Sequence, residues 1–257
     1  MSIFNLENKT AIVTGGYGHL GAAMCRALAS FGANVIVAGR SLEKFNSAFS
    51  EEQKKRIKFV EIDITNDASI KNCFENIFKT YGSIDILINN AFTLKSAKPE
   101  KTSREEWNYS MDGLITGLHC CIREVLPFME NKNGKIINIS SMYGMVSPDF
   151  EIYNEFPEFF NSAQYGAAKA AIIQLTKYYA NYLAQRGIRV NCVSPGTFPS
   201  ETVQEKKGFI SKLENKVPLK RIGKPEDLSG TIVLLASDAS SYITGQNISV
   251  DGGWTIS

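Results

Sequence analysis

The sequence predicts an α/β fold in which one doubly wound parallel sheet of seven strands carries helices on both faces. Short apolar, β-branched runs alternate with longer segments of helical spacing, and no linker, repeat or low-complexity segment interrupts the alternation. A glycine-rich turn also joins the first apolar run to the first helical segment. With 257 residues and 44% hydrophobic content, the chain is long enough for one large domain. We therefore assign residues 1–257 to a single domain.

Seven apolar runs are expected to be buried strands, because each is too short for a helix. They cover residues 11–13, 34–38, 57–62, 84–88, 135–139, 188–193 and 247–250. Helices are expected between them at residues 21–31, 42–52, 68–81, 104–129 and 167–185. The stretches 142–163 and 198–217 break this alternation. We expect loops or short helices there, near the strand ends at which ligands bind in open sheets.

The composition excludes several classes of partner. A formal net charge of +2 offers no field that would attract nucleic acid or an anionic membrane, which favours a small-molecule substrate. No segment reaches the roughly 18 apolar residues of a membrane span, and the first residues do not resemble a secretion signal. Five cysteines without C-x-x-C spacing indicate a reducing compartment, so we expect a soluble, cytoplasmic protein. With only two histidines, His19 and His119, the sequence lacks the ligand density of a zinc site, which predicts no metal site.

The stretch "AIVTGGYGHLGAAMCRALASFGANVIVAGR" is typical of a strand, a glycine turn, a helix and a second strand. Gly15 permits the tight turn, and Gly21 lets the helix pack closely on the sheet. The first N–H groups of the helix and its dipole then face any anion in the turn, which favours a pyrophosphate. A glycine-rich turn without a ligand is the alternative.

The turn T-G-G-Y-G-H-L-G resembles the T-G-x-x-x-G-x-G motif of the short-chain dehydrogenase/reductases, with His19 in place of the second motif glycine. The resemblance implies a Rossmann fold that binds NAD(P). Residues 16–21 also fit G-x-G-x-x-G, in which Gly16 or Gly18 would permit the close approach of a phosphate. By resemblance the turn contacts the coenzyme through Gly15, Gly18, His19, Leu20 and Gly21.

The end of the second expected strand indicates which coenzyme is used. Gly39 stands where relatives that prefer NAD carry a carboxylate, and Arg40 follows with a guanidinium suited to a 2′-phosphate. We therefore predict NADP(H), with NAD(H) as the alternative and an ordinary surface arginine as the simpler interpretation of Arg40. By resemblance, Asp63 and Ile64 bind the adenine, and Asn90 and Ala91 of "LINNAF" line the coenzyme site, although Phe92 replaces the usual glycine. Asn89 is interpreted as structural.

Tyr165 and Lys169 share a helix face, because residues four apart lie on the same side of a helix. A tyrosine with a pKa of about 10 exchanges protons poorly near neutrality. An adjacent ammonium favours the phenolate, so we predict that Lys169 lowers the pKa of Tyr165 and suits it to general acid and base catalysis. Small neighbours in "YGAAKAA" would let the coenzyme approach this helix.

Tyr-x-x-x-Lys is the active-site signature of the short-chain dehydrogenase/reductases, and the family adds a serine after the fifth strand. The resemblance assigns that role to Ser141 in "GKIINISSMYG", whereas Ser140 is expected to bond the backbone. It implies that hydride passes from NADPH to a carbonyl carbon while Tyr165 protonates the oxygen and Ser141 holds it. The resemblance also places Lys169 on the nicotinamide ribose. The reverse reaction oxidises the alcohol.

One member of the family's catalytic set is missing. Alignment on Thr116 and Gly117 puts Leu114 where relatives carry an asparagine, and Asn108 lies about two turns too early. A water molecule could replace the amide in the proton relay. Further along the chain, Pro195, Gly196 and Thr197 resemble the turn that holds the nicotinamide carboxamide. The C-terminal "ASSYITGQNISVDGGW" resembles relatives that form homotetramers, which predicts a homo-oligomer, a tetramer or a dimer.

The segment between Ser141 and Tyr165 is about twice as long as in typical relatives. Its surplus "MVSPDFEIYNEFPEFFNSA" combines aromatic and acidic side chains, which could close over a polar, hydroxylated substrate such as a sugar. An oligomer contact or a packed surface loop is the alternative. The stretch "SSMYGMVSPDFEIY" also resembles reductases of flagellin modification and nonulosonic sugar biosynthesis.

Two other functions remain open. The substrate could be a 3-oxoacyl thioester or a simple ketone, because similar reductases handle both. Alternatively, the protein could bind NADP without turnover and act as a redox sensor. The altered glycines and the missing asparagine motivate the sensor hypothesis, and the presence of Ser141, Tyr165 and Lys169 opposes it.

Overall fold

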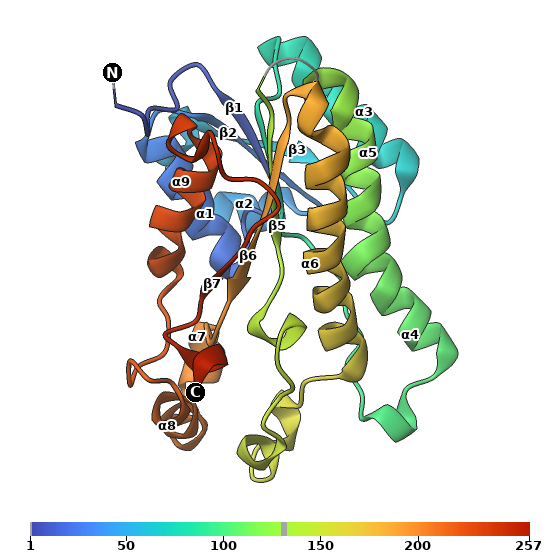
Figure 1. Cartoon of the computed structure of the whole chain (residues 1–257), viewed down its shortest axis with the longest axis vertical. Helices are drawn as coiled ribbons and strands as arrows, with labels where there is room; N and C mark the ends of the chain where they lie inside the picture. Colours follow the sequence, from blue (N-terminus) through green and yellow to red (C-terminus); the bar gives the residue numbers. More distant parts are fainter. Residues whose placement is uncertain (1, 130–132) are drawn as a thin grey trace.

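The computed structural model describes residues 2–129 and 133–257, and these form a seven-stranded sheet with every adjacent pair of strands parallel. The strand order is β3-β2-β1-β4-β5-β6-β7, which confirms the predicted doubly wound Rossmann fold (Figure 1). The strands are Thr10–Thr14 (β1), Asn34–Gly39 (β2), Ile57–Glu61 (β3), Ile86–Asn89 (β4), Lys135–Ile139 (β5), Arg189–Pro195 (β6) and Asn247–Val250 (β7).

Helices cover both faces of the sheet, with α1, α2 and α9 on one side and α3, α5 and α6 on the other (Figure 1). The described helices are His19–Ser30 (α1), Leu42–Ala48 (α2), Asp67–Tyr81 (α3), Arg104–Met111 (α4), Gly117–Met129 (α5), Ala163–Leu183 (α6), Glu201–Gln204 (α7), Lys207–Lys216 (α8) and Ser229–Ala236 (α9). None of them is long and apolar enough to cross a membrane.

The strands divide their side chains between two cores, because successive residues of a strand point to opposite faces. Ile12 and Ile36 pack with α3, α5 and α6, whereas Val13 and Val37 pack with α1, α2 and α9. Both faces are therefore buried, which explains why these strands are continuous apolar runs in the sequence.

Two predicted helices differ from the observed ones. The helix expected at 42–52 ends at Ala48, because Phe49 adopts an extended conformation and buries its ring against Phe45. The helix expected at 104–129 is interrupted by a π-helical stretch, Asp112–Thr116, between α4 and α5. This wider stretch coincides with the place where the family asparagine is missing.

The two irregular stretches lie together beyond the carboxyl end of the sheet (Figure 1). Residues 142–162 contain three short 3-10 helices, and residues 198–217 form α7 and α8, as predicted. A third hydrophobic cluster joins them, with Tyr143 and Tyr153 from the first stretch and Phe209 and Leu213 from α8. Trp254 from the C-terminal end completes it.

Candidate functional site

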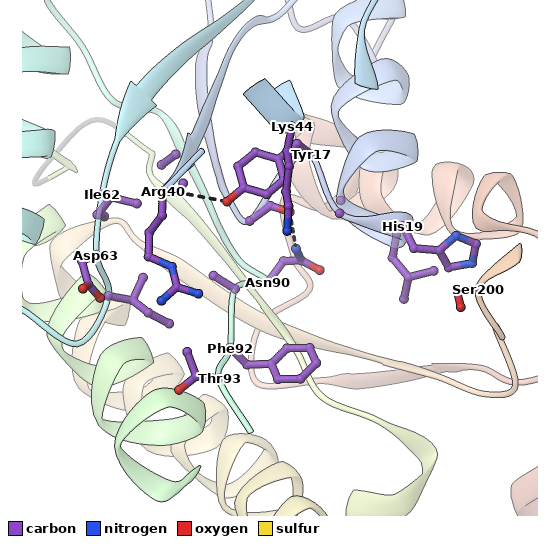
Figure 2. A pocket seen from close by; sticks show the side chains of 18 of the residues that line it. Tyr17, His19, Arg40, Lys44, Ile62, Asp63, Asn90, Phe92, Thr93 and Ser200 are labelled. Atoms are coloured by element: carbon purple, nitrogen blue, oxygen red, sulfur yellow. Dashed lines mark hydrogen bonds between the residues drawn. The ribbon is translucent and has the colours of Figure 1, made fainter. Parts of the chain in front are cut away.

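A cavity of about 520 Å³ opens over the carboxyl ends of β1 to β4 (Figure 2). β1 lies between β2 and β4 in the sheet, so the cavity sits where the strand order reverses, the usual ligand position in such folds. Most residues predicted to bind the coenzyme line it, namely Gly15, Gly18, His19, Leu20, Gly21, Arg40, Asp63, Ile64, Asn90, Ala91 and Tyr165.

The glycine turn depends on residues without side chains. Gly15 has a φ of +63°, and a Cβ there would lie 3.1 Å from the Ala91 Cα atom. A Cβ on Gly21 would lie 2.5 Å from the Gly15 carbonyl oxygen. Gly16 is buried against the Cys25 thiol and does not line the cavity, so of the two alternatives only Gly18 is placed to receive a phosphate.

Helix α1 begins directly at the cavity. Its N-cap is Gly18, which provides no side-chain hydrogen bond to the first-turn N–H groups. Those N–H groups and the helix dipole can therefore serve an anion. His19 is the first residue of the helix; its side chain is exposed and lines the cavity near Ser200 (Figure 2).

The end of β2 brings two cations to the cavity. Arg40 follows the strand, and Lys44 lies in the first turn of α2; both line the cavity. The Arg40 backbone N–H donates to the Tyr17 Oη at 3.1 Å. Figure 2 shows Tyr17 with its hydroxyl directed at Arg40. Lys44 and Tyr17 were not among the residues predicted from the sequence.

Asp63 lies on the wall beside Arg40. Its Oδ1 accepts hydrogen bonds from the Thr65 backbone N–H at 3.0 Å and from the Thr65 hydroxyl at 2.7 Å. These two hydrogen bonds, with a smaller contribution from the Arg40 charge, lower the pKa of Asp63 below its ordinary value. The carboxylate is therefore ionised and held in place as a hydrogen-bond acceptor.

The loop after β4 is tied to the glycine turn. The Thr14 hydroxyl accepts the backbone N–H groups of Asn90 and Ala91, each at 3.0 Å, and the Asn90 amide donates to the Thr14 and Gly15 carbonyls. Asn89 instead bonds Asn138 in the buried interior, which agrees with its structural interpretation. The loop thus fixes one wall of the cavity relative to the turn.

These features fit a dinucleotide coenzyme. The tight turn and the free N-terminus of α1 suit a pyrophosphate, Arg40 and Lys44 supply positive charge beyond β2, and Asp63 supplies an acceptor. Among the described residues, no cluster of side chains could hold a metal ion.

Tyr165, Lys169 and Ser141 meet at the far end of this cavity. Tyr165 and Lys169 lie on α6, and the Lys169 Nζ is 5.6 Å from the centre of the Tyr165 ring. Ser141 follows β5 and is hydrogen-bonded to Tyr165. The Ser140 hydroxyl donates to the Lys169 carbonyl at 2.7 Å, so the expected backbone role of Ser140 is confirmed. Both Ser141 and Lys169 are buried and do not line the cavity, so Tyr165 alone of the three faces open space.

The predicted acidification of the phenol is wrong for this structure. Burial raises the pKa of Tyr165, and the hydrogen bond with Ser141 lowers it by a smaller amount. Burial also lowers the pKa of Lys169 to about 8. The Lys169 ammonium donates to the Ile139 carbonyl at 2.9 Å and lies 5.2 Å from the centre of the Phe92 ring. Desolvation opposes the charged form of both groups and is the largest cause of each shift.

The turn after β6 does not reach the main cavity wall. Gly196 packs against the backbone of Asp251, and Thr197 is buried. Pro195 is the last residue of β6, where it pairs with Val250. The cavity is lined instead by Phe198 and Ser200, which follow this turn directly. The predicted contacts of Pro195, Gly196 and Thr197 therefore do not appear at the cavity surface.

The position of the missing asparagine is filled by the π-helical stretch. Leu114 is buried, as an apolar residue should be. A Cβ on Gly113 would overlap the Thr93 Oγ1, so no side chain fits at 113. Thr93 lines the cavity, is 8% exposed, and its hydroxyl has no hydrogen-bond partner among the described residues. The polar group nearest this stretch thus comes from the loop after β4.

A second cavity of about 430 Å³ adjoins Tyr165 on the other side. Its walls come from the long segment and from α6. The long segment contributes Met145, Pro148, Phe150 and Phe160, with polar groups from Asn161 and Ser162. The Ser162 hydroxyl is buried and has no partner among the described residues. Aromatic walls were predicted for this segment, and Phe150 and Phe160 provide them.

The acidic side chains of the segment do not face this cavity. Asp149 pairs with Lys216 at 3.3 Å, and Glu155 pairs with Lys212 at 2.6 Å. Glu151 and Glu158 are exposed. None of the four carboxylates lines the cavity, so the expectation that they receive substrate hydroxyls is wrong. Lysines of α8 hold Asp149 and Glu155 away from it.

Several cavity residues were missed from the sequence. Lys44 carries a weak signal, since a cation one turn after Arg40 on a helix can reach the same wall. Tyr17 and Thr93 lie inside or beside recognised motifs, at positions the motifs leave variable. Phe198 and Ser200 begin the stretch 198–217, which was expected near the ligand-binding strand ends, but the sequence does not indicate which of its side chains face the cavity.

Comparisons with known proteins agree with this geometry. The family profile described as enoyl-(acyl carrier protein) reductase matches residues 18–255. The chain is 34% identical over 256 residues to the 3-oxoacyl-[acyl-carrier-protein] reductase FabG of Chlamydia trachomatis serovar D, and the match covers 96% of this chain and 98% of that protein. It is also 34% identical to the trans-4-hydroxycyclohexanecarboxylate dehydrogenase of Sinomonas cyclohexanicum over 97% of this chain and 94% of that protein.

A solved structure is similar over the whole fold. The gluconate 5-dehydrogenase of Burkholderia cenocepacia, in complex with NADP and tartrate, superposes with a TM-score of 0.88 at 27% identity. The match covers 99% of this chain and 98% of that one. The chain therefore belongs to the short-chain dehydrogenase/reductase family and is an NAD(P)-dependent oxidoreductase that acts on CH–OH groups.

Proposed function

We propose that residues 1–257 act as one catalytic domain that interconverts a ketone and a secondary alcohol with NADP(H). The observation that carries this proposal is that Tyr165 lines both cavities, the one suited to a dinucleotide and the one walled by the long segment. A proton donor is needed where coenzyme and substrate meet, and Tyr165 is the titratable side chain common to both surfaces.

The choice of NADP(H) over NAD(H) rests on charge at the end of β2. Arg40 and Lys44 line the cavity, whereas position 39 is a glycine and provides no carboxylate for a ribose 2′-hydroxyl. Two cations on the cavity wall and no carboxylate at position 39 favour a 2′-phosphate.

In the reaction, the bound nicotinamide coenzyme supplies or accepts the hydride. Tyr165 holds the proton at its Oη and donates it to the substrate oxygen in reduction, or removes it in oxidation. Ser141, hydrogen-bonded to Tyr165, orients the phenol. Lys169, with a pKa of about 8, can hold or release a proton near neutrality behind Tyr165. Its bond to the Ile139 carbonyl fixes the ammonium in the interior.

The second cavity supports a substrate with an apolar face and a few polar groups. Phe150 and Phe160 stack with ring centres 5.5 Å apart, and Asn161 and Ser162 add polar groups. A ring bearing hydroxyls, such as a sugar of surface-glycan biosynthesis, meets both requirements. The resemblance of "SSMYGMVSPDFEIY" to reductases of flagellin modification and nonulosonic sugar pathways supports the same class. A 3-oxoacyl thioester is the second candidate, supported by the apolar character of the Met145 and Pro148 wall.

A substrate panel followed at the nicotinamide absorbance band tests the proposal. Cyclic polyols and keto sugars, 3-oxoacyl thioesters and simple cyclic ketones would be offered in both directions with NADP(H) and with NAD(H). We expect turnover with NADP(H) and at least one cyclic substrate, lost in Tyr165→Phe. Tight NADPH binding with no turnover of any compound would instead support the sensor function.

We also propose a homo-oligomer, a tetramer or a dimer, that works in the cytoplasm on a small molecule. Tyr178 and Tyr182 on α6 are each 59% exposed and stack on one another, which leaves an aromatic pair on the outer surface of that helix. The five cysteines are free and buried, as suits a reducing compartment. Light scattering of the purified protein would give its mass, and a monomer would contradict the oligomer.

A further inference from the structure

Tyr17 stands inside the glycine turn and has no role in the reaction described above. It lines the cavity beside Arg40 and Lys44 (Figure 2). Its Oη accepts the Arg40 backbone N–H at 3.1 Å. Its ring packs against the hydrophobic core on the α1 side of the sheet. The side chain is therefore held at both ends.

The ring of Tyr17 lies directly on Gly39. A Cβ on residue 39 would meet the Cε1, Cζ and Oη atoms of Tyr17, all within 3.0 Å. Real Cβ atoms essentially never approach another atom so closely, so any side chain at 39 requires the ring to move. Moving it would break the bond to Arg40 and disturb the packing on the core. Tyr17 and Gly39 are thus mutually dependent.

We propose that Tyr17 is a coenzyme-selecting residue: its ring fills the space of a side chain at position 39 and so keeps a carboxylate from that position. The hydroxyl also fixes the backbone from which Arg40 projects. Selection for the 2′-phosphate then has two parts, attraction by Arg40 and Lys44 and exclusion of an acid by Tyr17. This inference rests on the proposed use of NADP(H).

A double-mutant cycle at positions 17 and 39 tests whether Tyr17 keeps a carboxylate from position 39. The variants are Gly39→Asp, Tyr17→Ser and the double variant, and the probes are 2′,5′-ADP and 5′-ADP, titrated calorimetrically against the purified protein. With Tyr17 present, we expect Gly39→Asp to weaken both probes with little change in their ratio. In the Tyr17→Ser background, the same substitution should shift the ratio toward 5′-ADP by about tenfold or more, because the carboxylate can then reach the site.

A second set of variants uses Gly39→Ala, which adds a Cβ without a charge, and measures the Tm. It tests the same contact if Gly39→Asp does not fold. Gly39→Ala should lower the Tm by about 5 °C alone, and by much less in the Tyr17→Ser background. Tyr17→Phe is the matched control, because it keeps the ring and removes only the acceptor for Arg40. In the Tyr17→Phe background, Gly39→Ala should therefore lower the Tm by nearly as much as it does in the parent.

The outcomes separate this inference from the proposed function. If the unmodified protein binds 2′,5′-ADP no better than 5′-ADP, NADP(H) preference fails and the selecting role of Tyr17 fails with it. If the unmodified protein prefers 2′,5′-ADP but Gly39→Asp and Gly39→Ala have equal effects in both backgrounds, only the role of Tyr17 is overturned. Unequal effects in the stated direction support it.

Discussion

The coenzyme side and the substrate side of Tyr165 are built in different ways. On the coenzyme side, short turns hold the wall through hydrogen bonds to the main chain, such as that from the Asn90 side-chain amide to the Gly15 carbonyl. On the substrate side, the wall is held by side chains from distant segments, such as Phe159 against Phe209 with ring centres 4.6 Å apart. The first kind of wall needs particular residues at fixed spacing, whereas the second needs only compatible volumes.

This difference separates what a substitution can do on each side. A change in the glycine turn meets backbone atoms and cannot be accommodated by a rotamer change. A change in the aromatic cluster of Tyr153, Phe156, Phe159 and Phe209 meets other side chains, which can repack. We therefore expect the coenzyme site to tolerate little variation and the substrate site to carry specificity.

The largest expected effect lies at the junction of the two sides. Tyr165→Phe removes the proton donor and keeps the ring, so turnover should fall by roughly 10²–10⁴-fold. The Kd for NADPH, measured by titration, should change only a few-fold. Tyr153→Phe is the control, because it also removes a tyrosine hydroxyl. Tyr153 is buried in the third cluster and does not line the coenzyme cavity. Equal turnover in Tyr165→Phe and the parent would exclude the proposed chemistry.

The predictability of the site follows the same division. Gly15 and Gly21 could be placed from the spacing of the glycine turn, and Asn90 and Asp63 from the resemblance of short motifs to those of the family. The pairing of Asp149 and Glu155 with lysines of α8 depends on how two irregular stretches pack together. The spacing of residues within a short stretch of sequence does not predict that packing.

The fold was predicted more completely than the electrostatics. Seven apolar runs were enough to give seven strands, since a run buried on both faces has few other solutions. Burial is the largest influence on the pKa of Tyr165, and helical spacing gives only the separation of Tyr165 and Lys169. The sign of the shift therefore required the three-dimensional environment.

Phe209→Ala tests how far the substrate wall depends on side-chain packing. Phe209 contacts Tyr153, Phe156 and Phe159, so its truncation should lower the free energy of unfolding by about 3–5 kcal/mol, less where the cluster collapses. KM should rise more than kcat falls, and NADPH affinity should stay within a few-fold. Urea denaturation and steady-state kinetics measure these changes. A matched loss of NADPH affinity would show that the two sides are not separate.

The pH dependence of the free energy of unfolding of Lys169→Met, compared with that of the parent, tests whether Lys169 is desolvated. The pKa of Lys169 is about 8 in the folded chain and about 10.4 when unfolded, so between these values the unfolded chain binds the additional proton. The contribution of Lys169 to the free energy of unfolding therefore rises from pH 8 to about pH 10.4 and is constant below pH 8. The free energy of unfolding of Lys169→Met minus that of the parent should therefore be larger at pH 7 than at pH 10, by a few kcal/mol at most.

Urea denaturation of both proteins at pH 7, 8, 9 and 10 would measure that difference. Removal of the donor to the Ile139 carbonyl shifts the whole curve of the variant by a constant amount, so the pH dependence of the difference is the informative quantity. Parallel curves would mean that Lys169 is not desolvated in the folded chain.

The smallest expected effect concerns the acidic side chains of the long segment, which the sequence analysis expected to bind substrate. Glu155 pairs with Lys212 at the surface, so Glu155→Gln should change the free energy of unfolding by less than about 1 kcal/mol. It should leave KM unchanged, because Glu155 does not line the cavity beside Tyr165. Asn161→Ala is the contrasting variant, since its amide lines that cavity and donates to the Tyr153 hydroxyl at 2.8 Å. If KM rises in Glu155→Gln and not in Asn161→Ala, the acidic residues contact the substrate and the cavity with the aromatic walls does not bind it.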